Sequence, residues 1–509
     1  MKSRKFIYSA LIVVVLISVL ATSVLAASTT KSLATNYTLV NLSGSSATVT
    51  ASYYKTDGTQ WKAPDNFTIA ANGGQQIVRQ YTDPALPAGS GSVVVTSNQA
   101  LAGLVQVVIN PSSGQVPTSG AYTAISQGDT KFYIPQVGRN GPSATGTANS
   151  WIVIQNVGSA AVNVDVKFIK YGQSTVFYTK PITGIAVGAS YYYDVNTETN
   201  LTDATFYSAV VEVSGAGQIA VVSNLFFGAD SLMAYNGFGS LAPTYKWQVP
   251  LLYSRLTNSL TTSLVVQNLD TVDIPANDIT LLCTKDPAVT GVATVTTTNA
   301  SVIAPNGVSA WNTLTQTGIF PAAWYGACTV TSATNKNFVV LVMHRYTNNA
   351  EMSAHEAISG TSTDKTVFVP LAAKRLGNGF STGITVQNLT AAPITVDITY
   401  TRSPDCVVGA ATYTETAVAI AANGSIIRNL RLATNPVGLG MPDGWFGTMK
   451  VVGTGAIGAY VANTYLSVNG DRFMAYLGFT QPYSDFALTF IMVTGLAKVD
   501  PVTFIKDGN

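Results

Sequence analysis

An internal repeat with a period of roughly 116 residues constrains this fold more than any other feature of the sequence. Its clearest landmark is a strand-like segment ending in Asn, and the four copies end at Asn41, Asn156, Asn268 and Asn388. These residues are 115, 112 and 120 positions apart. A period of this length matches a whole β-sandwich domain and is far longer than the unit of a solenoid. We therefore expect four tandem domains.

Three further landmarks recur in the same order. A leading strand with an aromatic residue and a proline occurs at 132–135, 247–250 and 368–370. A turn ahead of a strand occurs at 71–73, 186–188, 305–307 and 422–424. A closing strand occurs at 121–123, 233–238, 353–356 and 474–479. Three of the turns contain Asn-Gly, which is the strongest short-range signal for a hairpin.

The segments between the landmarks alternate apolar and polar residues, as half-buried strands do. Seven or eight such strands in about 100 residues predict an all-β fold of four tandem immunoglobulin-like β-sandwich domains. The predicted parts are 1–26 (signal peptide), 27–130 (repeat one), 131–245 (repeat two), 246–364 (repeat three), 365–482 (repeat four) and 483–509 (tail).

The segment I-Q-N-V-G-S-A-A-V-N-V-D-V from Ile154, followed by I-A-V-G-A-S from Ile185, carries a resemblance to a known family. It resembles the CARDB-type and related immunoglobulin-like modules of bacterial secreted and cell-surface proteins, over about half of each repeat. The resemblance implies a secreted, often tandem and non-catalytic scaffold. It carries over no site residues.

The first 26 residues predict export. Lys2, Arg4 and Lys5 precede an apolar stretch from Phe6 to Leu20, and Val24-Leu25-Ala26 ends the segment with the small residues that a signal peptidase requires. We expect cleavage before residue 27, with an uncleaved anchor as the alternative. The apolar stretch is shorter than the ~20 residues that span a bilayer, and no later segment is long and uniform enough to do so. The expected location is therefore extracellular or on the cell surface.

The charge balance excludes one class of partner. Charged residues make up 10% of the chain, and the formal net charge is +2. Binding to nucleic acid requires a concentration of basic residues that neutralises phosphates, and this sequence has none. Self-association, or binding to a surface glycan or protein, remains open.

The chain has three cysteines, and two of them fall in the same repeat. An oxidising compartment makes a bridge between Cys283 and Cys328 plausible, with two buried thiols as the alternative. Cys406 is then a free or intermolecular thiol.

The two ends of the repeat array do not match. Repeat one lacks the leading strand, whereas a strand-like segment at 486–493 follows the last closing strand. Because an unpaired edge accepts a strand, we predict that this segment is a donor strand for repeat one of the next subunit, which would build a filament. Its candidate contact residues are Phe486, Leu488, Phe490 and Met492. The alternative is that the tail folds back on repeat four or packs irregularly.

Catalysis is not expected. The two histidines, His344 and His355, lie on consecutive strands near Glu351 and Glu356, so a metal site is conceivable. However, His355 stands where other repeats have tyrosine, which favours a packing role. No nucleophile motif or calcium loop is present, the acidic residues occur singly in turns, and no cofactor is expected.

These observations lead to three interpretations of function, of which the third is an exported enzyme with a cryptic carboxylate site. The first is a non-catalytic exported structural protein, such as a filament subunit. The second is an adhesin or carbohydrate-binding array that uses exposed aromatic residues, for which Tyr191, Tyr192 and Tyr193 are the ligand-stacking candidates.

Overall fold

The computed structural model describes residues 31–493 apart from 81–82, 112–117, 127, 144–145, 229–230, 241–243, 348–350, 378, 466–472 and 481–482. The predicted signal peptide (1–26) and the end of the tail (494–509) lie outside the described residues. Within them, no helix has the length and apolar character needed to cross a membrane.

The all-β fold is confirmed, because nearly all regular structure in the described residues is β-strand. The strands of repeat one are β1 (Lys31–Asn41), β2 (Ala47–Lys55), β3 (Gln60–Ile69), β4 (Gln75–Arg79), β5 (Gly89–Pro111) and β6 (Thr118–Thr123). Repeat two contains β7 (Lys131–Arg139), β8 (Gly141–Ser143), β9 (Gly146–Asn156), β10 (Val162–Lys170), β11 (Val176–Ile185), β12 (Ser190–Asp194), the 3-10 helix η2 (Val195–Thr197), β13 (Thr205–Val213), β14 (Ile219–Phe227), β15 (Ser231–Asn236) and β16 (Phe238–Gly239).

Repeat three contains β17 (Lys246–Ser254), β18 (Leu260–Asn268), β19 (Ile279–Lys285), β20 (Thr294–Thr298), β21 (Val308–Asn312), β22 (Trp324–Ser332), β23 (Phe338–Tyr346), β24 (Met352–Glu356) and β25 (Ile358–Ser359). Repeat four contains β26 (Thr366–Lys374), β27 (Phe380–Asn388), β28 (Ile394–Arg402), β29 (Thr412–Ile420), β30 (Ser425–Asn429), β31 (Trp445–Gly453), β32 (Ile457–Tyr465) and β33 (Met474–Leu477). The tail forms β34 (Tyr483–Val493).

Each of repeats two to four consists of two antiparallel sheets. In repeat two they run β11-β10-β13-β7-β16 and β12-β9-β14-β15. The alternating pattern of β10 places Val164, Val166 and Phe168 in the core while Asn163 is exposed. This is the period-two pattern expected of a sheet with one buried face. In repeat one the long strand β5 runs through both layers and joins them into one seven-stranded sheet.

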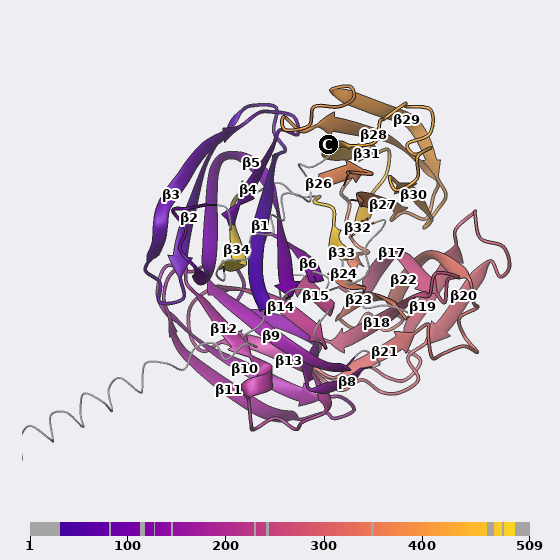
Figure 1. Ribbon diagram of the computed structural model, residues 1–509. Helices are drawn as coiled ribbons and strands as arrows, with labels where there is room; N and C mark the ends of the chain where they lie inside the picture. Colours follow the sequence, from indigo (N-terminus) through magenta and orange to yellow (C-terminus); the bar gives the residue numbers. More distant parts are fainter. Residues whose placement is uncertain are drawn as a thin grey trace, which may run out of the picture.

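The four repeats form a ring in chain order (Figure 1). The closing strands β6, β15, β24 and β33 meet at its centre, where each contacts the next and β33 contacts β6 again. Four alanines at equivalent positions of these strands are all buried: Ala121, Ala234, Ala354 and Ala475. Small side chains allow the strands to approach closely, so the ring closes around a packed centre. We call the contacts between successive repeats the first, second and third junctions, and the contact between repeats four and one the fourth junction.

The C-terminal strand β34 lies in repeat one of its own chain, beside strands that are more than 380 residues earlier (Figure 1). It pairs antiparallel with β5 from Asp485↔Thr96 to Val493↔Gly89, and Ala34 of β1 pairs with Val493 on its other side. Phe486, Leu488 and Met492 are buried in the core of repeat one, and the side chain of Phe490 is not among those described. The strand therefore completes the repeat that lacks a leading strand.

The register of β34 matches that of the other leading strands. Its pairing with β5 shifts between Leu488 and Ile491, and β17 and β26 shift at the corresponding steps, Val249/Leu252 and Val369/Ala372. Thr489 occupies the place that Pro250 and Pro370 hold in those strands. The missing landmark of repeat one is thus present at the other end of the chain, without its proline.

In this structure the predicted donor strand lies in repeat one of its own chain, and donation to a neighbouring subunit stays a prediction. The alternative of a tail folded onto repeat four is not observed. The physical reason for this placement is that the four repeats close into a ring. Leu104 and Ala121 of repeat one pack in the same core cluster as repeat four, so the chain leaves repeat four next to the vacant edge.

Candidate functional site

A cleft of about 460 Å³ lies at the third junction, and aromatic and polar side chains from two repeats line it. Repeat three contributes Leu251, Tyr253, Leu256, Asn258, Leu260, Asp286, Ala288, Tyr325 and Tyr346. Repeat four contributes Gly383, Thr385, Ile427, Asn429, Arg431, Leu432, Asn435, Tyr460, Ala462, Thr464 and Phe473. We call this the third-junction cleft.

The floor of the cleft is apolar and aromatic. Tyr346, Tyr460 and Phe473 are buried, and the ring centroids of Tyr346 and Phe473 are 5.9 Å apart in an edge-to-face arrangement. Tyr253 and Tyr325 are only half-buried at the cleft. Half-buried tyrosines can offer a ring face and a hydroxyl to a bound molecule.

The two histidines lie behind this floor as a hydrogen-bonded pair. Their Nε2 atoms are 3.3 Å apart, and the ring of His344 packs edge-to-face against Tyr253 and Tyr460. His355 Nδ1 must donate to the carbonyl oxygen of Glu356, which can only accept. His344 Nε2 therefore donates to His355 Nε2, and His344 Nδ1 accepts from the Thr262 hydroxyl. This series of hydrogen bonds gives every ring nitrogen a partner while both histidines are neutral.

Burial keeps both histidines neutral. It lowers the pKa of His355 to about 4 and that of His344 well below its usual range, where the neighbouring His355 adds to the effect. No group of three or more His, Cys, Asp or Glu side chains among the described residues is placed to hold a metal ion. The hydrogen bonds and ring contacts of His355 are those of a packing residue.

Arg431 forms the polar edge of the cleft. Its guanidinium lies within hydrogen-bonding reach of the Tyr346 hydroxyl and interacts with Glu351. Burial raises the pKa of Glu351 to about 7, and Arg431 opposes that rise. Asp286 also lines the cleft, and its carboxylate accepts a hydrogen bond from the backbone of Ala288.

Glu356 lies at the centre of the ring. Its carboxylate accepts a hydrogen bond from the backbone N–H of Asn236 at 2.6 Å, and the Asn236 amide donates to the Thr123 hydroxyl at 2.6 Å. Burial raises the pKa of Glu356 to about 7. At one equivalent position the four closing strands have Thr123, Asn236, Glu356 and Leu477. Glu356 is the only titratable residue of these four.

The three candidate tyrosines of β12 differ in their surroundings. Tyr191 is exposed to 37%, whereas Tyr193 is buried and its hydroxyl lies 3.2 Å from Glu198. The Tyr192 hydroxyl spans the first junction, where it donates to the Gly91 carbonyl at 2.6 Å and lies 2.9 Å from the Ile491 carbonyl. Only Tyr191 therefore has a ring available for stacking, and Tyr192 holds β34 in place.

The cysteines lie away from the cleft. Cys283 and Cys328 are opposite each other on β19 and β22 and form a disulfide in the core of repeat three. Cys406 is a buried free thiol in repeat four.

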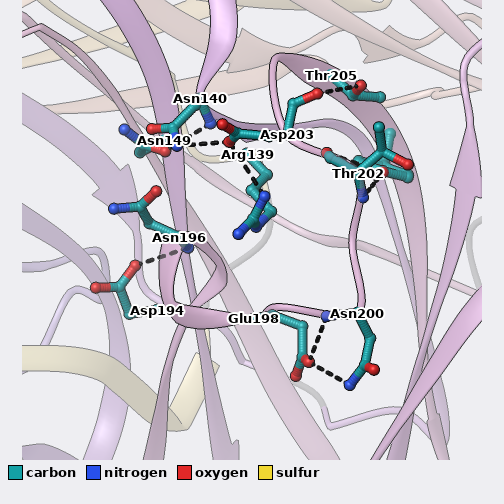
Figure 2. Close-up of polar contacts among 11 residues, drawn as sticks. Arg139, Asn140, Asn149, Asp194, Asn196, Glu198, Asn200, Thr202, Asp203 and Thr205 are labelled. Carbon is teal, nitrogen blue, oxygen red and sulfur yellow. Dashed lines mark hydrogen bonds and ion pairs between the residues drawn. The ribbon is translucent and has the colours of Figure 1, made fainter.

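A loop cluster at one end of repeat two is polar, and hydrogen bonds among its own residues hold it together (Figure 2). Asp203 accepts hydrogen bonds from Arg139 and Asn140 there, and Glu198 accepts from both the backbone and the side chain of Asn200. These contacts are those of loop-stabilising turns. A larger cavity of about 560 Å³ at the first junction is lined by only two aromatic residues, Tyr54 and Phe486.

Sequence reasoning did not identify the third-junction cleft, because its residues come from two repeats and face each other only in the ring. The available signal was the departure of repeat three from the others, since it contains both histidines. No protein-family model matches the chain, and no curated protein is similar to it.

Proposed function

We propose that this protein is an exported, non-catalytic structural component of the bacterial cell surface, and that its working unit is the closed ring. The observation that carries this proposal is the position of β34 between β5 and β1. A ring whose last strand lies in its first repeat resists opening from either end, which suits a load-bearing or surface-exposed part.

A filament remains a second form of the same structural role. Strand β34 would then complete repeat one of a neighbouring chain with the same contacts. A strand tethered beside its own acceptor has a high effective concentration there, so the closed ring is favoured when chains are dilute.

Electron microscopy and light scattering of the intact protein and of a variant lacking 483–509 test this proposal. We expect compact, monomeric rings for the intact chain and open particles for the deletion variant. Filaments that form from the intact protein and disappear on deletion support strand exchange instead. Rings that are unchanged by deletion contradict the role of the strand. Fractionation of the producing cells checks export, because a cytoplasmic protein is incompatible with a surface role.

The second candidate function is an adhesin or carbohydrate-binding protein. The third-junction cleft favours it, because tyrosines and side-chain amides converge there from two repeats. A glycan array probed with the intact ring tests this function independently of assembly.

A further inference from the structure

We propose that the third-junction cleft binds a short neutral saccharide, with Tyr253 and Tyr325 against the sugar ring and Thr464 bonded to one of its hydroxyls. This inference rests on the second candidate function and specifies its site and ligand class.

The size and composition of the cleft suit such a ligand. Its volume of about 460 Å³ lies within the range of pockets for small molecules. A saccharide has apolar C–H faces and a rim of hydroxyls, so it needs aromatic rings together with amide or hydroxyl partners. The cleft supplies both, since Asn258, Asn429 and Asn435 line it beside the tyrosines.

Thr464 gives an independent indication of a polar ligand. Its side chain is 8% exposed and lines the cleft, and its Oγ1 has no hydrogen-bond partner among the described residues. An unpaired buried hydroxyl is unfavourable. The oxygen itself is buried, so a ligand hydroxyl in the cleft would satisfy it after rotation of the Thr464 side chain about χ1.

The charges of the cleft favour a neutral ligand. The charge of Arg431 acts on Glu351 and Tyr346, and the Asp286 carboxylate accepts a hydrogen bond from the backbone of Ala288. One cationic and one anionic side chain therefore line the cleft, and each already has a protein partner. An anionic ligand would lack the unpaired cation that it needs.

The ring's internal symmetry identifies a residue of the cleft, Ile427, that a larger side chain can replace. The register of β27 with β30 pairs Thr385 with Ile427, and the register of β9 with β12 pairs Val153 with Tyr192. Ile427 thus holds the position that Tyr192 occupies at the first junction. The tyrosine crosses that junction to reach Gly91 and Ile491, whereas isoleucine lines the third-junction cleft without crossing it.

This comparison supplies the test variant. Ile427→Tyr should fill the cleft with a side chain that the fold already accepts at the equivalent position. Thr464→Val removes the unpaired hydroxyl with little change in shape. Tyr191→Ala is the matched control, because Tyr191 is an exposed tyrosine on another repeat.

The measurement is saturation-transfer NMR, followed by titration calorimetry, with maltose, cellobiose, lactose and N,N′-diacetylchitobiose as probes. We expect at least one probe to bind the intact ring. The Ile427→Tyr variant should abolish that binding, Thr464→Val should weaken it about tenfold, and Tyr191→Ala should leave it unchanged.

Two results overturn the inference: no binding of any probe at millimolar concentration, or binding that Ile427→Tyr and Thr464→Val both leave intact. Loss of binding in the Tyr191→Ala variant would place the saccharide site in repeat two and would also overturn the inference. A glycan array that is positive while the cleft variants bind normally preserves the carbohydrate-binding function and rejects this site. Circular dichroism and light scattering confirm that each variant remains a folded ring.

Discussion

The hydroxyl of Thr448 in repeat four donates a hydrogen bond to the carbonyl oxygen of Gly73 in repeat one, 3.2 Å away. Ser92 makes the same contact to Gly188 at the first junction, and Ser208 makes it to Asn306 at the second. The fourth junction, which joins residues 375 positions apart, therefore repeats the contacts of junctions between consecutive repeats.

The third junction departs from this rule. Ala327 follows Gly326, as Ser92 follows Gly91 and Thr448 follows Gly447, and alanine has no hydroxyl. Across this junction Gln387 donates to the side-chain oxygen of Gln248 at 3.0 Å. The junction with the altered contact is also the one that contains the cleft.

Thr448→Val should weaken closure of the ring. The change keeps the shape of the side chain but removes one buried hydrogen bond, so we expect a loss of about 1 kcal/mol in the free energy of unfolding. Urea denaturation measures it. Thr412→Val, at an exposed strand position, is the control, and equal effects of the two variants would contradict the special role of Thr448.

Leu488→Asp should open the ring. Leu488 is fully buried in repeat one, and an unpaired carboxylate cannot be accommodated there. We expect β34 to leave its site, with a larger radius of gyration in X-ray scattering and faster proteolysis after residue 480. Ser484→Asp places the same charge at an exposed position of the strand and should have no such effect. A compact Leu488→Asp protein would disprove closure by β34.

Glu356→Gln should change the pH dependence of stability. Burial raises the folded-state pKa of Glu356 from 4.5 to about 7, so the folded protein binds more protons than the unfolded chain between these values. The free energy of unfolding should therefore fall as pH rises from 4.5 to 7 and then level off. The shift bounds this loss at roughly 3 kcal/mol, and partial exposure of the side chain reduces it to about 2 kcal/mol.

Glutamine resembles the protonated acid and removes this loss. The variant should match the unchanged protein near pH 4 and exceed its stability above pH 7. Glu351 and both histidines are present in both proteins, so their titration cancels in the comparison. Stability curves that stay parallel from pH 4 to 8 would contradict the prediction.

Reduction of the Cys283–Cys328 disulfide should destabilise repeat three. The bridge closes a loop with a sequence separation of 45 residues, for which restriction of the unfolded chain contributes about 3–4 kcal/mol. We expect dithiothreitol to lower the midpoint of thermal unfolding of the unchanged protein. A Cys283→Ala/Cys328→Ala variant should respond no further to the reductant, and an equal response of both proteins would argue against the bridge.

The third-junction cleft was beyond sequence reasoning for a physical reason. Periodicity shows that Tyr253 and Tyr460 lie on strands, but it does not show which repeat each strand faces. Their proximity depends on how two sandwiches pack, and that depends on contacts such as Gln387 with Gln248. The same limit applies to Tyr192, which was expected as an exposed stacking ring and instead spans a junction.

The sequence by itself determined that the chain is all-β, because alternation of apolar residues with period two leaves no other regular structure able to bury them. It also determined that repeat one lacks a strand and that 486–493 is a spare one. Only the tertiary structure shows the strand in repeat one of the same chain. The strand lies in its own chain because the packed centre of closing strands brings repeat four back beside repeat one and its vacant edge.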